Sequence, residues 1–415
     1  MHLRETGFII SRVDGGRKPR VSRAKPAQRL HRTIIATGWV SFFTDLGSEL
    51  IYPLLPLFLT IDLGATRAIV GLIEGLAEGT PQLLRWVSGA WADRIRNRKW
   101  LILAGYTISS LVKPFIGLSR LASQVLFLRV LDRCGKGIRT APRDALVGDL
   151  APAGQRGYAF GFQRAMDHLG AMGGGLAAFL LVGVIGLALK WAIFASVVPG
   201  VLSVLIILIF IRERKGRRPA KVTARESLTW KGFPRAYYFF LGSAVIFALA
   251  NSSDAFLLLR AHELGTAIAL VPLLWAALHL VKAMTSLWGG RLSDLWGRKP
   301  VLIGGWLLYS LVYVGFALMK GVWVPWLLFV LYGCFFGATE GTARALVAEL
   351  VQPERRGAAF GVLGTVEGAL LIPASLLTGW LWDLTGSAAA PLMLSGGLSA
   401  LAAFWLGLTI SSGRR

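Results

Sequence analysis

Carboxyl groups recur four residues apart in the first two long apolar segments of the chain. Asp45 and Glu49 form one such pair, and Glu74 and Glu78 form the other. A spacing of four residues places both members of a pair on one face of a helix. Ionisable groups within apolar helices are costly and mark functional sites, and a buried carboxyl group can exchange protons near physiological pH. We therefore predict that Asp45, Glu49 and Glu78 include the group that carries the proton-exchange chemistry.

The fourth apolar segment, residues 122–148, carries the most charge. Its charged side chains fall on two adjoining faces of one helix: Arg129, Asp132, Arg133, Lys136 and Arg139. Such a helix cannot face lipid, so these side chains must line a wet cavity or pair with the acids of the first two segments. Other polar residues of apolar segments complete the candidate substrate-binding set: Glu74, Asp167, His168, Asn251, Asp254, Tyr332, Glu340 and Glu367.

Two interpretations of these charges remain open. In the first, the acids and bases neutralise one another and serve only as a structural scaffold. In the second, one carboxylate exchanges a proton while the basic groups of the fourth segment bind an anionic substrate. The sequence holds no P-loop, no metal-ligand spacing and no catalytic cluster, so we predict neither an enzyme nor a metal or other cofactor.

Long apolar segments must position these side chains. Hydrophobic residues make up 54% of the 415 residues, above the roughly 45–50% of soluble proteins. About 20 apolar residues are enough to cross a bilayer as a helix. The sequence therefore predicts an all-α membrane protein with twelve transmembrane helices, at residues 33–60, 68–91, 100–119, 122–148, 158–183, 187–211, 236–260, 266–289, 300–319, 322–348, 358–382 and 388–410.

The excess of basic residues is distributed unevenly between the two sides of these helices. The formal net charge is +23, and counting helices from residue 33 puts nearly all basic clusters on the side of the N-terminus. Positively charged loops remain in the cytoplasm, so we expect an inner-membrane protein with both termini cytosolic, and no nucleic-acid partner. The expected cytosolic parts are a basic, disordered tail at 1–32, a basic linker at 212–235 and a short tail at 411–415.

The second half of the chain repeats the first at a shift of 200 residues. Residues 143–162 align without gaps to residues 343–362, with nine of twenty positions identical, and two shorter matches precede them in the same order in both halves. Duplicated halves joined by a basic linker are a transporter architecture, in which two bundles rock around a central site. We predict bundles at 33–211 and 236–410.

Two short segments at equivalent places resemble one motif. SGAWADRIRNRKWLI (88–102) and GGRLSDLWGRKPVL (289–302) resemble the loop signature of the major facilitator superfamily, and the resemblance extends from about residue 33 to residue 410. It implies the twelve-helix fold of that superfamily, and it implies a latch that holds the cytosolic side closed when the outer side is open. The latch residues would be Gly89, Asp93, Arg94, Arg98, Gly290, Asp294, Arg298 and Lys299.

These features together predict a secondary active transporter. We expect a monomer that exports a small molecule by proton-coupled alternating access, as in bacterial efflux members of the superfamily. One alternative is transport of an organic or inorganic anion on the basic cluster of segment 122–148. An alternative of another class is a channel or a non-transporting membrane receptor, which substrate accumulation against a gradient would exclude.

Overall fold

The computed structural model describes residues 30–94, 98–151, 156–211 and 232–409. Most of the expected tail at 1–32 and of the expected linker at 212–235 therefore lies outside the described residues. The first six spans are α1 (Arg32–Ile51) with α2 (Leu55–Leu57) and η1 (Phe58–Asp62), α3 (Arg67–Arg94), α4 (Arg98–Gly117), α5 (Ala122–Leu150), α6 (Arg156–Phe179) with η2 (Leu180–Val184), and α7 (Leu189–Phe194) with α8 (Val197–Phe210).

Six further spans follow in the second half. They are α9 (Arg235–Ala250) with α10 (Ala255–Glu263), η3 (Ile268–Leu270) with α11 (Val271–Trp296), α12 (Arg298–Leu318), α13 (Val324–Leu350), η4 (Pro353–Arg355) with α14 (Arg356–Thr385), and α15 (Ala389–Thr409). Ten of the twelve spans are long and apolar enough to cross a membrane. The other two are α3 and α5, whose charged residues lower their hydropathy. The expectation of an all-helical membrane fold is confirmed.

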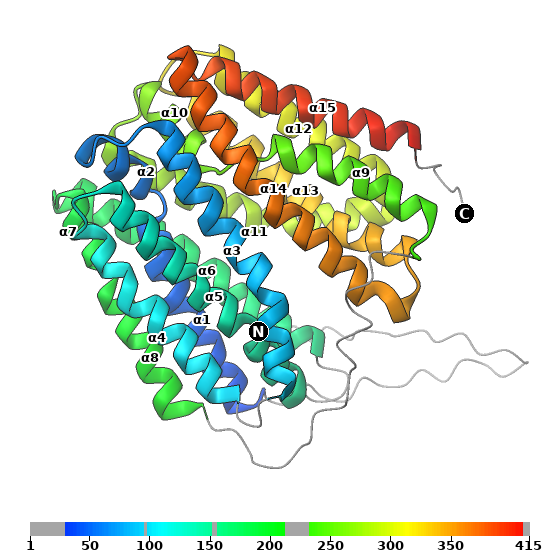
Figure 1. Cartoon of the computed structure of the whole chain (residues 1–415), viewed down its shortest axis with the longest axis horizontal. Helices are drawn as coiled ribbons and strands as arrows, with labels where there is room; N and C mark the ends of the chain where they lie inside the picture. The colour runs from blue at the N-terminus through cyan, green and yellow to red at the C-terminus, as the bar shows by residue number, and fades with distance from the viewer. Residues whose placement is uncertain (1–29, 95–97, 152–155, 212–231, 410–415) are drawn as a thin grey trace, which may run out of the picture.

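The helices form two groups with the same internal packing, drawn in blue to green and in green to red in Figure 1. In the first group α1 packs against α6 and α8, α5 packs against α3 and α4, and α4 packs against α8. The equivalent pairs recur in the second group, where α9 packs against α14 and α15, α13 against α11 and α12, and α12 against α15. The main contacts between the groups, α3 with α14 and α6 with α11, are equivalent as well. The packing therefore repeats as the sequence does.

Glycines allow α3 to approach α14 closely. A Cβ atom added at Gly71 would lie 2.2 Å from the carbonyl oxygen of Ser375, and one added at Gly79 would lie 2.7 Å from that of Gly368. Small residues at four-residue spacing create such a smooth face between membrane helices. This contact fixes α3, which carries Glu74 and Glu78, at the boundary between the groups.

The first and seventh spans are both interrupted near their middle. The first span breaks after Ile51, next to Pro53, and proline removes a backbone donor from a helix. The seventh span breaks at residues 251–254, between α9 and α10. The interruptions face each other, because the Tyr52 hydroxyl lies 3.3 Å from the Ser253 hydroxyl. Broken helices at equivalent places in two repeats are typical of transporter binding sites.

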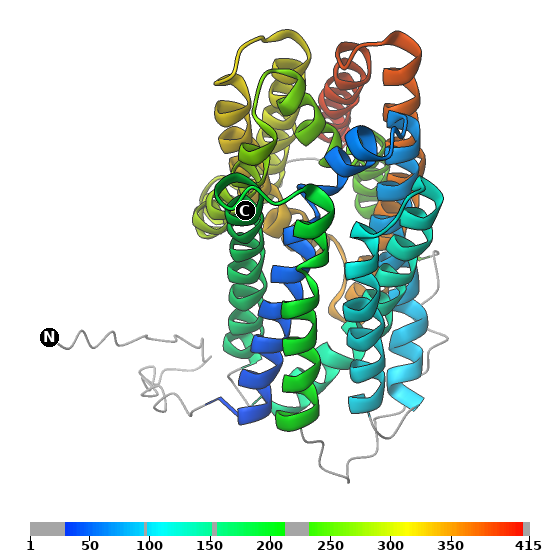
Figure 2. The same cartoon turned by 90° about the vertical axis from the view of Figure 1, so that its left-hand side faces the viewer.

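The two groups are in contact at one end and separate toward the other. We call the end where α1 begins and α15 ends the tail end, and the opposite end the far end. α3 and α14 pack closely along the stretch from Gly71 to Gly79 of α3. Figure 1 shows the two helices farther apart toward the tail end, and Figure 2 shows the long helices of the first group from the side. The far end is therefore the closed end of this conformation.

Candidate functional site

A buried ion pair joins α3 to α5. The Arg129 guanidinium donates to both carboxylate oxygens of Glu74, with Nη2 at 2.8 Å from Oε1 and 2.9 Å from Oε2, and its Nε lies 3.2 Å from Oε1. Both side chains are at most 2% exposed. Bidentate arginine–carboxylate pairs are strong and geometrically specific, so this pair fixes the two helices to each other.

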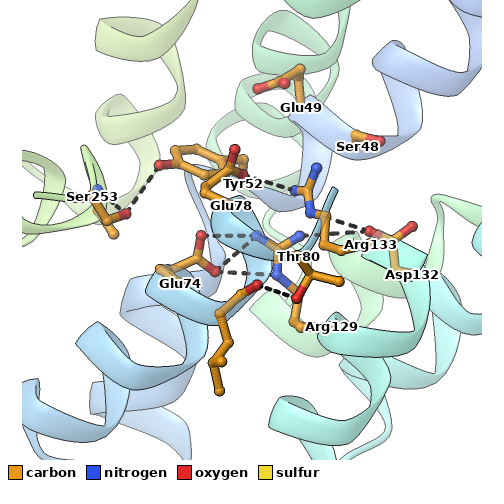
Figure 3. Close-up of polar contacts among 12 residues, drawn as sticks. Ser48, Glu49, Tyr52, Glu74, Glu78, Thr80, Arg129, Asp132, Arg133 and Ser253 are labelled. Atoms are coloured by element: carbon orange, nitrogen blue, oxygen red, sulfur yellow. Dashed lines mark hydrogen bonds and ion pairs between the residues drawn. The ribbon is translucent and has the colours of Figure 1, made fainter. Parts of the chain in front are cut away.

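Asp132 extends this pair into a network of three acids and three bases. Its carboxylate lies 3.8 Å from Arg129, 3.6 Å from Arg133 and 3.8 Å from Lys113 of α4, and it accepts a hydrogen bond from the Ser109 hydroxyl. Arg133 also lies 3.4 Å from Glu78, which is 34% exposed. Figure 3 shows the five network side chains of α3 and α5 pointing toward one another: Glu74, Glu78, Arg129, Asp132 and Arg133. The network neutralises itself, as the scaffold interpretation expects.

The remaining candidates of the first group have other surroundings. The Arg139 guanidinium lies 4.2 Å from the ring centre of Tyr106 and is buried. Asp167 on α6 lies 3.9 Å from Arg143. Lys136 and Asp45 are half-buried, and neither makes an ion pair within 4 Å among the described residues.

Glu49 connects the first group to the second. Its carboxylate accepts a hydrogen bond of 2.8 Å from the indole nitrogen of Trp275 on α11, and the same oxygen lies 3.9 Å from His279. Trp275 in turn stacks on Tyr52 at 4.6 Å between ring centres. Glu49 is 23% exposed. It is thus a carboxylate of the first group held by side chains of the second, and no guanidinium within 4 Å neutralises it among the described residues.

The remaining candidates lie on or next to several helices, most of them in the second group. Asp254 accepts a hydrogen bond of 2.5 Å from the Tyr332 hydroxyl, while Asn251 directly follows the last residue of α9 and is half-buried. Glu340 forms an ion pair across the groups with Arg164 of α6, and both side chains are exposed. The other candidates are His168, half-buried on α6, and Glu367, exposed on α14.

Comparison with known proteins identifies the family. The sequence model of the major facilitator superfamily matches residues 37–368 and 239–413. The chain is 34% identical over 364 residues to an uncharacterised transporter of that superfamily from Methanocaldococcus jannaschii, a match that covers 86% of this chain and 90% of the relative. The chain belongs to the major facilitator superfamily. It is therefore a multi-pass membrane transporter and not an enzyme, and the resemblance found in its motifs is confirmed.

Other similarities within the superfamily are more distant. The multidrug resistance protein MdtH of Citrobacter koseri is 31% identical over 124 residues, which are 29% of this chain and 30% of that protein. The crystal structure of the nucleoside transporter NupG matches with a TM-score of 0.75 at 14% identity, over 91% of this chain and 99% of that chain. A D-xylose–proton symporter matches with a TM-score of 0.69 at 15% identity, over 91% of this chain and 97% of that chain. At such identities the structures show the superfamily fold alone.

The superfamily's signature motif lies at the tail end of both groups. In the first copy, Gly89, Asp93 and Arg94 fall in a stretch of α3 whose side chains lie outside those described. Arg98 lies 2.7 Å from Asp149 of α5, and Arg298 forms the equivalent ion pair with Glu349 of α13. Lys299 donates to the Gly407 carbonyl at 2.8 Å, while Gly290 has open space around it and Asp294 is exposed. In this conformation these basic residues bind helices within one group.

The far end has contacts between the groups that the sequence did not predict. Asp383 of α14 accepts hydrogen bonds from the backbone N–H groups of Arg67, at 3.0 Å, and Ala68, at 2.8 Å. These are the first residues of α3, where backbone donors are free and a negative charge is favourable. The Arg67 guanidinium lies 3.3 Å from Glu263 of α10. We call these four residues the far-end clasp.

Sequence reasoning also missed three residues near the centre: Tyr52, Lys113 and Trp275. Lys113 gave a usable signal, since it is a lysine within an apolar segment that spans the membrane. The sequence held no such signal for Trp275, because tryptophans are common at membrane interfaces. The clasp residues lie at helix ends, where charged residues are also common.

Proposed function

We propose that this member of the major facilitator superfamily exports a small molecule across the cytoplasmic membrane in exchange for protons, with Glu49 as the coupling carboxylate. The observation that carries the proposal is the bond from Trp275 to Glu49, because it makes an ionisable group part of the contact between the two groups. Glu74 and Asp132 lie deep within the charge-balanced network of one group. Glu49 is the better candidate since it is partly exposed and touches both groups.

Protonation of Glu49 would weaken the contact between the groups. A carboxylate is a stronger hydrogen-bond acceptor than a carboxylic acid. The hydrogen bond from Trp275 therefore favours deprotonated Glu49 in the present conformation. The charged and titratable groups that face Glu49 are Asp45 on its own span, Arg133 and Lys136 on α5, and His279 and Lys282 on α11. Binding or release of a proton at Glu49 would therefore change the balance between conformations.

Alternating access would then move the two six-span bundles, 33–211 and 236–410, as rigid bodies. The charge-balanced network would keep α3, α4 and α5 together within the first bundle. The excess of basic residues near the tail end supports a cytosolic location of that end, so the present conformation would be open to the cytosol. The far-end clasp would hold it in that state.

Two observations bear on the alternatives. Arg129 and Arg133 are paired with Glu74, Asp132 and Glu78, so the basic cluster of α5 leaves for an anion Lys136 and Arg139, whose guanidinium already lies over the Tyr106 ring. The similarity to a multidrug resistance protein over 124 residues supports export.

The proposal is tested by Glu49→Gln in proteoliposomes with an imposed pH gradient, with ethidium as the fluorescent probe. The variant should lose gradient-driven ethidium accumulation and retain ethidium exchange in the absence of a gradient. Asp62→Asn is the control, because Asp62 is an exposed acid outside the candidate sites. Proton-driven accumulation by Glu49→Gln, or no accumulation by the wild type, would count against the proposal.

A further inference from the structure

The ammonium group of Lys282 lies over aromatic rings. Its Nζ is 3.3 Å from the ring centre of Phe336 on α13 and 5.8 Å from that of Trp275, which precedes it by two turns on α11. A cation over an aromatic face is attracted by the negative charge density of the ring. Among the described residues, Lys282 makes no ion pair within 4 Å, so the rings are its nearest favourable partners.

Acidic side chains surround this cation at longer range. Lys282 interacts electrostatically with the acids Asp254, Glu340 and Glu49, and also with the basic groups Arg164, His168 and His279. Arg164 is already paired with Glu340. Asp254 makes no ion pair within 4 Å among the described residues, and it is bonded to Tyr332, whose ring lies 4.9 Å from that of Phe336. A carboxylate so placed favours a cation next to the rings.

We propose that Phe336 and Trp275 form the binding site for the cationic group of an organic cation, and that Lys282 occupies this site when no substrate is bound. A lysine on a flexible four-carbon stem can leave the rings without moving the backbone. The incoming cationic group would take the place of the Lys282 ammonium, and its apolar body would lie against the neighbouring aromatic side chains. This inference names the substrate class of the transporter proposed above and rests on that function.

The site lies where both groups of helices meet. Phe336, Trp275 and Lys282 belong to the second group, whereas Glu49, bonded to Trp275, belongs to the first. A cation over Trp275 would add positive charge next to Glu49 and disfavour a proton there. The organic cation and the proton would therefore compete, which is the linkage that an antiporter requires.

Equilibrium binding to the purified full-length protein in detergent tests the site without any gradient. The probe is tetraphenylphosphonium, and tetraphenylborate is its control of matched shape and opposite charge. Lys282→Met removes the internal competitor and keeps an apolar stem, so it should bind tetraphenylphosphonium about tenfold more tightly than the wild type. Phe336→Leu should bind it about fivefold more weakly.

Two control variants separate competition from general disturbance. Lys282→Arg keeps a cation over the ring and should bind with nearly wild-type affinity, and Lys320→Met removes an exposed lysine outside the site. Unchanged or weaker tetraphenylphosphonium binding by Lys282→Met would overturn the proposal. Preference for tetraphenylborate, lost in Lys282→Met, would identify an anion site instead. Absence of proton-driven flux would refute the proposed coupling and leave these binding results unaffected.

Discussion

Replacing Asp383 by asparagine should release the far end of the molecule. The Asp383 carboxylate accepts two backbone hydrogen bonds at the N-terminus of α3. Asparagine keeps one oxygen acceptor but loses the negative charge that interacts with the helix dipole. For an exposed helix terminus, these losses amount to about 1 kcal/mol. That is roughly a fivefold shift of the equilibrium away from the closed far end.

Distance measurements between spin labels at Thr66 and Ser387 would detect this shift, since both residues are exposed and flank the clasp. The labels require Cys134 and Cys334 to be replaced by serine. The population with a long distance should rise about fivefold in Asp383→Asn.

The control is Asp62→Asn, an exposed acid that takes no part in the clasp, which should leave the distances unchanged. Glu263→Gln should shift the population less than Asp383→Asn, because an exposed ion pair contributes only about 0.2–1 kcal/mol. Equal long-distance populations in wild type and Asp383→Asn would refute the role of the far-end clasp in holding the far end closed.

Two further substitutions test the interior. Arg129→Met leaves Glu74 buried without its partner and should lower the free energy of unfolding by about 3–5 kcal/mol, measured by thermal unfolding. Arg298→Gln breaks an exposed ion pair and should lower it by less than about 1 kcal/mol. Similar decreases in the two variants would contradict the buried network. Gly71→Ala should separate α3 from α14 and lower the unfolding temperature, because its Cβ would lie 2.2 Å from a carbonyl oxygen. Gly304→Ala should leave the unfolding temperature unchanged, because its Cβ would enter open space. An equal decrease in both variants would argue against close packing of α3 on α14.

Helical periodicity predicted which faces carry charge but not which charges pair. The four-residue spacing placed Glu74 and Glu78 on one face of α3, and the density of charge on α5 required partners for Arg129 and Arg133. Which carboxylate meets which guanidinium depends on the relative height and rotation of the two helices. Those are set by packing, for example the glycine contact between α3 and α14.

The contacts between the halves could not be predicted from the sequence. Trp275 and Glu49 are 226 residues apart, and Asp383 and Arg67 are 316 apart. Nothing in the local sequence distinguishes these residues from ordinary interfacial tryptophans and charged helix ends. Their meeting depends on the conformation in which the far end is closed, so even a correct fold would not have identified them.

The repeat itself indicates where function resides. Scaffold contacts are duplicated at a shift of 200 residues, as in the pairs Arg98–Asp149 and Arg298–Glu349. At the centre the same shift relates unlike residues: Lys136 of α5 corresponds to Phe336 of α13.

The polar half and the aromatic half of the centre therefore come from different repeats. Two identical halves would present like surfaces to a ligand between them. The Glu49 carboxylate of the first bundle beside the aromatic rings of the second instead suits a molecule with a cationic group and an apolar body, which must contact both bundles to be bound. Because such a molecule would bridge the bundles, its binding would depend on their relative position, and this dependence is what alternating access needs.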